Sequence, residues 1–162
     1  MKNFPIIDKE TGREYWISRS VAVVAFIYAF DNNNERYILA VKRGKGTPDP
    51  EYVGKWCLPC GYIDFDETLD EAVTREVFEE TGFKLNPTLL EIININSDPK
   101  SDKRQNITIR YKYVCKENVS NIKLSTKNSE KDEVDGVTFI KISGIDLFDW
   151  AFNHKDLIKQ NF

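Results

Sequence analysis

One predicted helix, over residues 68–82, constrains the fold more than any other segment of this chain. Thr68 and Glu71 are spaced as a capping box, and Gly82 is a natural C-terminal stop. The apolar positions between them form one stripe at helical spacing: Leu69, Ala72, Val73 and Val77. The segment is therefore expected to be an amphipathic helix that packs this stripe against the protein core.

Three glutamates occupy the same side of that helix. At about 100° per residue, Glu76 falls in the middle of the apolar stripe, Glu80 close beside it and Glu79 at its edge. Carboxylates buried so close together lose hydration and repel one another unless a positive charge lies between them. A hard divalent cation, which prefers oxygen ligands, is the simplest such charge. A solvated acidic helix with an Arg75–Glu79 pair is the alternative, and the angular positions argue against it.

The spacing around this helix is that of a known signature. Gly61 is followed after five residues by Glu67 and, after seven more, by Arg75-Glu76-Val77-Phe78-Glu79-Glu80-Thr81-Gly82-Phe83. Residues 61–83 thus resemble the Nudix box of the Nudix hydrolase superfamily. Every polar and glycine position of that pattern is matched, and Phe83 stands where the family has an aliphatic residue. So many fixed positions make this match more specific than a lone glycine motif.

The resemblance implies an α/β fold, a three-layer α/β/α sandwich around a mixed sheet. It implies metal-dependent hydrolysis of the pyrophosphate linkage in a nucleoside diphosphate bonded to another moiety, with Mg²⁺ or Mn²⁺ as cofactor. Arg75 is expected to act in catalysis by orienting a box glutamate. By matching positions, the expected metal ligands are Glu76, Glu79, Glu80, Glu67 and the carbonyl oxygen of Gly61.

The catalytic base is less well defined by the resemblance, because family members take it from different places. Some use a box glutamate, and others use a glutamate in a loop before a late strand. In this chain that loop covers residues 127–133, where Glu133 is the first candidate and Glu130 the second. A solvated acidic turn is an equally good interpretation of these two residues.

The substrate has to be read from other loops. Asp98-Pro99-Lys100-Ser101-Asp102-Lys103-Arg104 resembles the DPxxDxR loop of a branch that includes ADP-ribose pyrophosphatases and ADP-ribose-sensing regulators. Pro99, Arg104 and Arg43 are the expected substrate-binding residues, since both arginines can form charge-assisted bonds to phosphate. As alternatives, Pro99 is a turn residue and Arg43 is a surface charge at a strand end. ADP-ribose, cleaved to AMP and ribose 5-phosphate, is the leading substrate.

Two other function classes remain open. One is a different Nudix activity, the hydrolysis of nucleoside triphosphates, nucleotide sugars or dinucleoside polyphosphates. The other is a non-catalytic module that binds ADP-ribose or another nucleotide. The intact set of glutamates favours catalysis. Phe78 points away from the apolar stripe, so it packs either under a loop or against another subunit, and a homodimer is the expectation in the second case.

Composition bounds the class of protein. The chain has 162 residues, a net charge of −3 and 41% hydrophobic residues. We expect one domain over residues 1–162, located in the cytoplasm. The charge gives no footprint for nucleic acid, and the apolar run at residues 21–30 is too short to cross a bilayer. The expected partner is therefore a small nucleotide, with neither nucleic acid nor membrane.

Strands are expected at residues 20–30, 36–42, 89–96, 106–114 and 134–142, with short helices at 145–152 and 155–160. Residues 44–55 are expected to form a long functional loop.

Cys57 and Cys60 form a CxxC, which is read as two reduced thiols more readily than as a redox pair or half a zinc site. Cys60 stands where the family has glycine, so a positive φ there would strain it.

Overall fold

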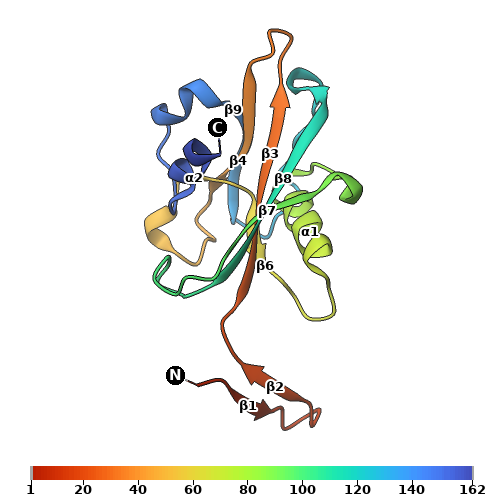
Figure 1. Ribbon diagram of the computed structural model, residues 1–162, viewed down its shortest axis with the longest axis vertical. Helices are drawn as coiled ribbons and strands as arrows, with labels where there is room; N and C mark the ends of the chain where they lie inside the picture. Colours follow the sequence, from red (N-terminus) through yellow and green to blue (C-terminus); the bar gives the residue numbers. More distant parts are fainter. Residues whose placement is uncertain (1, 162) are drawn as a thin grey trace.

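A mixed β-sheet lies between two helical layers, as expected for an α/β/α sandwich (Figure 1). The computed structural model describes residues 2–161. Helix α1 (Leu69–Thr81) covers one face of the sheet. Helix α2 (His154–Gln160) and a 3-10 helix at Ile142–Leu147 cover the other. The strands of this sheet are β3 (Val21–Phe30), β4 (Arg36–Arg43), β5 (Trp56–Cys57), β6 (Cys60–Tyr62), β7 (Glu91–Asn96), β8 (Ile107–Asn118) and β9 (Val134–Lys141).

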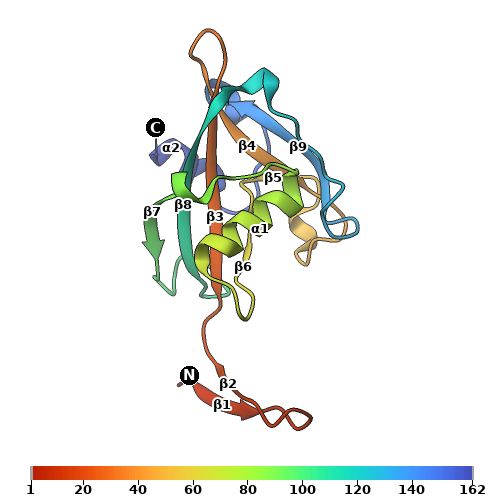
Figure 2. The same ribbon diagram turned by 90° about the vertical axis from the view of Figure 1, so that its right-hand side faces the viewer.

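Strand β3 runs through the centre of the sheet and is apolar throughout because both of its faces are covered (Figure 2). Val23, Ala25 and Ile27 face α1, whereas Val24 and Phe26 pack with the α2 layer. One edge of β3 pairs with β8 in parallel and the other with β4 antiparallel. A strand buried on both sides is expected to read as a continuous hydrophobic run, which is what the sequence shows.

The short strands β5 and β6 lie where β3 and β4 diverge. β5 pairs with β4 at Cys57 and Val41, and β6 pairs with β3 at Cys60 and Val24. Residues 56–62 therefore run from one central strand to the other. This path brings Gly61, the residue that opens the expected motif, against α1.

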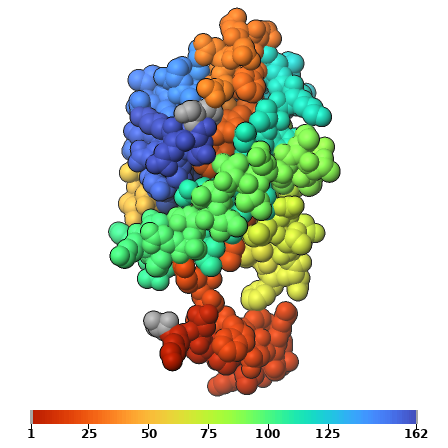
Figure 3. All heavy atoms as spheres, in the orientation of Figure 1, coloured from red at the N-terminus to blue at the C-terminus, as the bar shows by residue number. Residues whose placement is uncertain are grey.

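Residues 4–17 form a hairpin that the sequence did not predict. Strands β1 (Phe4–Ile7) and β2 (Glu14–Ile17) form a separate two-stranded sheet. Figures 1 and 3 show it standing apart from the main body. It approaches the segment before α1, where the Tyr15 ring meets the Phe65 ring edge-on at 5.3 Å between centroids.

The expected strands at 20–30, 36–42, 89–96, 106–114 and 134–142 are confirmed within a few residues at their ends. The terminal helix expected at 155–160 is confirmed as α2. The helix expected at 145–152 is wrong in its second half. The Trp56 amide donates to the Asp149 carbonyl at 2.8 Å, and the Ala151 amide donates to the Trp56 carbonyl at 2.7 Å. These bonds hold residues 149–151 beside β5 and end the 3-10 helix at Leu147.

None of the helices among the described residues has both the length and the apolar character that crossing a bilayer requires. The other short 3-10 helices lie in loops, at Pro50–Tyr52, Pro87–Leu89 and Val119–Asn121.

Candidate functional site

The ends of α1 form as the sequence predicts. The Thr68 hydroxyl accepts from the Glu71 amide at 3.3 Å, and the Glu71 carboxylate accepts from the Thr68 amide at 2.7 Å. Gly82 ends the helix at a φ of 68°, a left-handed conformation that suits glycine. The two caps fix which residues of α1 face the sheet and therefore where its glutamates lie.

Glu76 and Glu80 are mostly buried and Glu79 is the most exposed, as predicted, but Glu80 lies deeper than Glu76, which reverses the predicted order of these two. The Glu80 side chain is 3% exposed, that of Glu76 16% and that of Glu79 44%. Their neighbours Ala72, Val73 and Val77 are fully buried in the core against β3. Two carboxylates thus lie on the core-facing side of the helix, where each must be compensated.

Arg75 provides most of that compensation. Its guanidinium donates to Glu67 at 2.6 and 3.0 Å, to Glu76 at 2.8 Å and to Glu79 at 3.2 Å. It also donates to the Tyr62 carbonyl at 2.9 Å. One arginine therefore joins three of the motif glutamates to the strand that precedes the helix. We name Arg75, Glu67, Glu76, Glu79 and Glu80 the carboxylate cluster.

Glu80 is compensated differently because it lies deeper. Its Oε2 accepts from the Cys60 amide at 3.0 Å. Its Oε1 is buried, has no hydrogen-bond partner among the described residues, and lies 3.9 Å from Nη1 of Arg43. Arg43 is itself buried and donates through Nε to the Thr47 hydroxyl at 3.0 Å. The interpretation of Arg43 as a surface charge is therefore wrong.

Gly61 leaves room for a carboxylate beside β6. A Cβ atom at this position would lie 2.1 Å from Cδ of Glu76, so no larger residue fits without moving that side chain. The neighbouring Cys60 belongs to β6 and does not have a positive φ. A cysteine in place of the family's usual glycine therefore causes no backbone strain at this position. Cys57 and Cys60 are both free thiols.

The loop over residues 127–133 approaches the same region through the backbone. The Gly44 amide donates to the Glu133 carbonyl at 2.7 Å, and the Gly46 amide to the Asp132 carbonyl at 2.7 Å. A Cβ atom on Gly44 would lie 2.2 Å from the Asp132 oxygen, so the approach requires glycine. Burial is the main cause that raises the pKa of Glu76, and the charge of Glu133 acts in the same direction.

The protonation of the glutamates follows from their surroundings. Burial raises the pKa of Glu80 well above its usual range, and Cys60 and Glu76 act in the same direction. Burial also raises the pKa of Glu76, although Arg75 opposes it. The hydrogen bonds from Arg75 lower the pKa of Glu67. A cation entering this cluster would favour the ionised carboxylates.

A second group of polar side chains lies on the loops. Arg104 donates to the Tyr62 hydroxyl at 3.3 Å and forms an ion pair with Asp49. Asn106 donates to the same hydroxyl at 3.2 Å. We name Tyr62, Arg104, Asn106 and Asp49 the rim cluster.

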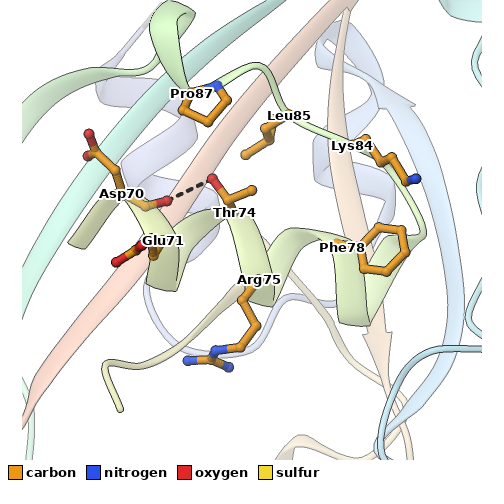
Figure 4. Close-up of a pocket in the computed structure, with 8 residues that line it drawn as sticks. All are labelled: Asp70, Glu71, Thr74, Arg75, Phe78, Lys84, Leu85 and Pro87. Carbon is orange, nitrogen blue, oxygen red and sulfur yellow. Dashed lines mark hydrogen bonds between the residues drawn. The ribbon is translucent and has the colours of Figure 1, made fainter. Parts of the chain in front are cut away.

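A groove lies elsewhere on the described part of the chain. It has a volume of about 520 Å³ and occupies the outward side of α1, with Phe78, Lys84, Leu85 and Pro87 in its wall (Figure 4). Arg75 reaches its edge, but Glu76, Glu79 and Glu80 do not line it. We place the candidate site at the carboxylate cluster because the buried charges there need a ligand, whereas the groove is mainly an apolar surface.

Comparison with known families identifies the family of this chain. A family model described as NUDIX domain matches residues 19–160. The chain belongs to the Nudix family. Its Nudix box is the segment from Gly61 to Phe83, which holds the whole carboxylate cluster.

Curated relatives match parts of this Nudix chain. It is 34% identical over 104 residues to a protein of Methanocaldococcus jannaschii named ADP-ribose pyrophosphatase, covering 63% of this chain and 55% of the relative. It is 37% identical over 75 residues to a Bacillus subtilis protein named putative 8-oxo-dGTP diphosphatase, covering 46% and 44%. The chain thus spans about half the length of these two relatives.

Solved structures share the Nudix fold. The NUDIX domain of Shewanella oneidensis NrtR, complexed with ADP ribose, matches with a TM-score of 0.72 and 22% identity over 90% of this chain and 87% of that one. A bifunctional NMN adenylyltransferase/ADP ribose pyrophosphatase from Francisella tularensis, complexed with AMP and a Mn ion, matches with a TM-score of 0.69 and 24% identity over 88% and 41%. At these identities the likeness establishes the fold alone.

The fold brings together most, but not all, of the residues singled out in the sequence. Glu67, Glu76 and Glu79 meet at Arg75, and Glu80 lies behind them against Arg43. Arg104 lies in the rim cluster rather than in the carboxylate cluster. Pro99 is exposed at the loop tip. The residues that sequence reasoning missed are Tyr62 in its polar role, Asp49, Asn106 and Thr47.

Only a weak sequence signal pointed to these missed residues. Asp49 and Thr47 belong to the loop expected to be functional at 44–55, but nothing in that loop distinguishes them from its other polar residues. Tyr62 reads equally well as a core aromatic residue.

Proposed function

We propose that this protein is a metal-dependent Nudix pyrophosphohydrolase that hydrolyses ADP-ribose to AMP and ribose 5-phosphate. The observation that carries the proposal is the convergence of Glu67, Glu76 and Glu79 on Arg75, with the buried carboxylate of Glu80 behind them. A diphosphate cannot bind carboxylates directly, because both are anionic. The cluster therefore needs cations to serve such a substrate.

The donor set fits Mg²⁺ or Mn²⁺, both of which prefer carboxylate and carbonyl oxygens. Glu76, Glu79 and Glu80 would hold the metal, with Glu67 and the Gly61 carbonyl as further ligands. The unpartnered Oε1 of Glu80 supports this assignment because it is a buried oxygen that still lacks a donor. When bound, a divalent metal neutralises charge on the diphosphate and lowers the pKa of a coordinated water.

The present arrangement is not yet a metal cage. Among residues 2–161, no three His, Cys, Asp or Glu side chains are grouped so as to enclose a cation. Arg75 instead engages Glu67, Glu76 and Glu79. Glu76 and Glu79 would hold a metal with the carboxylate oxygens that Arg75 does not engage, and Arg75 would keep its bonds to Glu67 and the Tyr62 carbonyl.

Glu133 is our first candidate for the catalytic base, and a box glutamate is the alternative. The electrostatic effect of Glu133 on Glu76 supports its placement near the cluster. Measuring kcat for Glu133→Gln beside Glu130→Gln distinguishes the two loop residues. A base at Glu133 predicts a loss of about 10²-fold or more in the first variant and little change in the second. Equal activities of the two variants would favour a box glutamate as the catalytic base.

The choice of ADP-ribose is supported by the Methanocaldococcus relative named ADP-ribose pyrophosphatase and by the Shewanella domain complexed with ADP ribose. Arg104 presents an exposed guanidinium that can meet a phosphate. Arg43, buried against Glu80, and Pro99, exposed at the loop tip, remain proposed substrate-binding residues. The Bacillus relative named putative 8-oxo-dGTP diphosphatase favours the alternative of a nucleoside triphosphate substrate.

The test is substrate profiling with Mg²⁺ across ADP-ribose, nucleoside triphosphates, nucleotide sugars and dinucleoside polyphosphates. We expect ADP-ribose to give the highest kcat/KM, and Glu79→Gln to lose about 10³-fold or more of that rate. Glu91→Gln, an exposed carboxylate on β7, is the matched control and keeps full activity. ADP-ribose near the bottom of the profile would refute the substrate. Binding without hydrolysis would favour a non-catalytic module.

We also propose a homodimer that covers the hairpin of β1 and β2. Phe4, Ile6, Ile7, Trp16 and Ile17 are large apolar residues, all more than 40% exposed on this hairpin. A two-stranded sheet alone is only marginally stable in water, so a second surface against it would stabilise it. Sedimentation of the full chain beside a Trp16→Glu, Ile7→Glu variant tests this. A wild-type monomer would contradict it.

The cytoplasmic location stays a prediction.

A further inference from the structure

Tyr62 belongs to both clusters at once. Its carbonyl accepts a hydrogen bond from Arg75 at 2.9 Å, in the carboxylate cluster. Its hydroxyl accepts from Arg104 at 3.3 Å and from Asn106 at 3.2 Å, in the rim cluster. Tyr62 directly follows Gly61, which lies against the Glu76 carboxylate. A single residue therefore connects the glutamates to the loop that carries Arg104.

The loop over residues 97–106 is constructed so that Arg104 projects from a fixed base. The Asp102 carboxylate accepts from the Arg104 amide at 2.5 Å and from the Asn106 amide at 3.1 Å. The Asp98 carboxylate accepts from the Lys100 amide at 2.9 Å. Both aspartates of the DPxxDxR pattern thus form the turn itself, which leaves the arginine as the group free to act beyond it.

Arg19 closes the base of this loop. Its guanidinium donates to the backbone carbonyls of Ser97 at 2.9 Å and Asn106 at 3.1 Å, and also to that of Gln105. Three bonds from one side chain to the two ends of a ten-residue loop limit how far the loop can shift. Arg104 therefore has a defined origin, and what remains to be fixed is its long side chain.

Two partners fix the Arg104 side chain from different directions. The Tyr62 hydroxyl accepts a hydrogen bond from Nη1 of Arg104. The carboxylate of Asp49, in the loop before β5, accepts one from Nη2. The Arg104 side chain is nevertheless 44% exposed, and Tyr62 is 40% exposed. The guanidinium is thus oriented but not enclosed. It keeps donor capacity for an incoming oxygen, since arginine carries five N–H groups.

We infer that Tyr62 is a positioning residue that holds Arg104 at a fixed place relative to the box glutamates, so that the guanidinium receives a phosphate oxygen of the substrate. This inference rests on the proposed function and deepens it. Arg104 and a metal ion held by the box glutamates would then both contact one diphosphate. Holding the arginine in advance avoids the entropic cost of ordering it when the substrate binds.

The alternative is that the rim cluster only braces the loops. A brace would act on stability, and its removal would affect kcat and KM together. A positioning residue acts through Arg104, so removing its hydroxyl should matter only while Arg104 is present. The two possibilities therefore differ in a double-mutant cycle.

The experiment measures KM, kcat and Tm for wild type, Tyr62→Phe, Arg104→Met and the double variant, in the full chain with Mg²⁺ and ADP-ribose. Tyr62→Phe removes one oxygen and should raise KM about 3- to 10-fold, with kcat within about twofold and Tm unchanged. Arg104→Met should raise KM about 10-fold or more, since it loses a charge-assisted bond. The double variant should match Arg104→Met alone.

Tyr15→Phe is the control, because Tyr15 lies on the N-terminal hairpin and meets Phe65 through its ring. It should match wild type in KM and kcat. Multiplicative effects of the two substitutions, an unchanged KM in either single variant, or a fall in Tm with kcat and KM affected together would overturn the inference.

The inference and the proposed function fail in different ways. If wild type does not hydrolyse ADP-ribose, the proposed substrate is wrong. The cycle is then measured on the nucleotide that wild type hydrolyses best. Non-additivity there supports the role of Tyr62, and multiplicative effects refute it.

Discussion

Two arginines organise this molecule in contrasting ways. Arg75 lies on a capped helix, and its side chain is 27% exposed and bonded to three glutamates. Arg104 lies on a loop, and its side chain is 44% exposed between one carboxylate and one hydroxyl. Charges held on a buried helix are placed accurately and interact strongly, whereas charges on loops are weaker and easier to vary. The difference suggests that the helix sets the chemistry and the loops set the substrate.

Among the tests of this contrast, the largest effect should come from filling the space beside the carboxylate cluster. Gly61→Ala places a Cβ atom about where the Glu76 carboxylate now lies. We expect kcat/KM to fall about 10²-fold or more, because a displacement of about 1 Å is that costly in a site held for catalysis. Gly144→Ala, where an added Cβ meets nothing within 4 Å, is the control in the same assay. Full activity in Gly61→Ala would show that Glu76 need not stay in place.

The next effect concerns His154, a buried histidine that contacts the segment between β5 and β6. His154 Nδ1 accepts from the Leu58 amide at 3.0 Å. Burial, together with the nearby charges of Arg110 and Arg43, lowers the pKa of His154 to about 3. The folded protein therefore keeps His154 neutral, whereas an unfolded histidine is protonated below about pH 6.5.

Stability should accordingly be constant with respect to this group above about pH 6.5 and fall as the pH drops towards 3, by up to about 1.4 kcal/mol per pH unit. Denaturant unfolding of wild type and His154→Asn across this range isolates the effect. Asparagine can still accept from the Leu58 amide, yet it does not titrate. Identical pH slopes in the two proteins would show that His154 is not held neutral.

Replacing Arg75 tests how much the carboxylate cluster depends on it. Arg75→Met leaves Glu76 without its side-chain donor and Glu67 with only the Asp64 amide, and we expect a loss of about 2 kcal/mol in the free energy of unfolding in chelator. Millimolar Mg²⁺ should raise the Tm of wild type and raise that of the variant more, because cations relieve the carboxylate repulsion. No stabilisation of wild type by Mg²⁺ would count against the metal site.

The smallest effect should come from the rim. Asp49→Asn removes the ion pair with Arg104, and we expect the free energy of unfolding to change by less than about 0.5 kcal/mol, since the pair is open to solvent. The same unfolding titration in 0.5 M salt should leave even this difference unresolved. A loss as large as that of Arg75→Met would erase the contrast between the clusters.

The comparison also marks where sequence reasoning succeeded. The helix bounds, both of its caps and the greater exposure of Glu79 follow from local spacing and were predicted. The deeper burial of Glu80 than of Glu76 was not predicted, because it depends on contacts with Cys60 and Arg43 outside the helix. The central strands were predicted because a strand covered on both faces must be apolar along its whole length. The extended segment at residues 149–151 was not predicted, because its bonds run to Trp56, far away in the chain.

The sequence by itself determined the chemistry of this protein, since the residues of the Nudix box lie within one helix and the short segment before it. Only the tertiary structure decided that Arg43 is buried beside Glu80, and that Tyr62, Asp49 and Arg104 meet. Arg104 is 42 residues from Tyr62 and 55 residues from Asp49 in the sequence. Helical periodicity fixes neighbours within a turn or two, whereas contacts between loops depend on where the sheet places their ends.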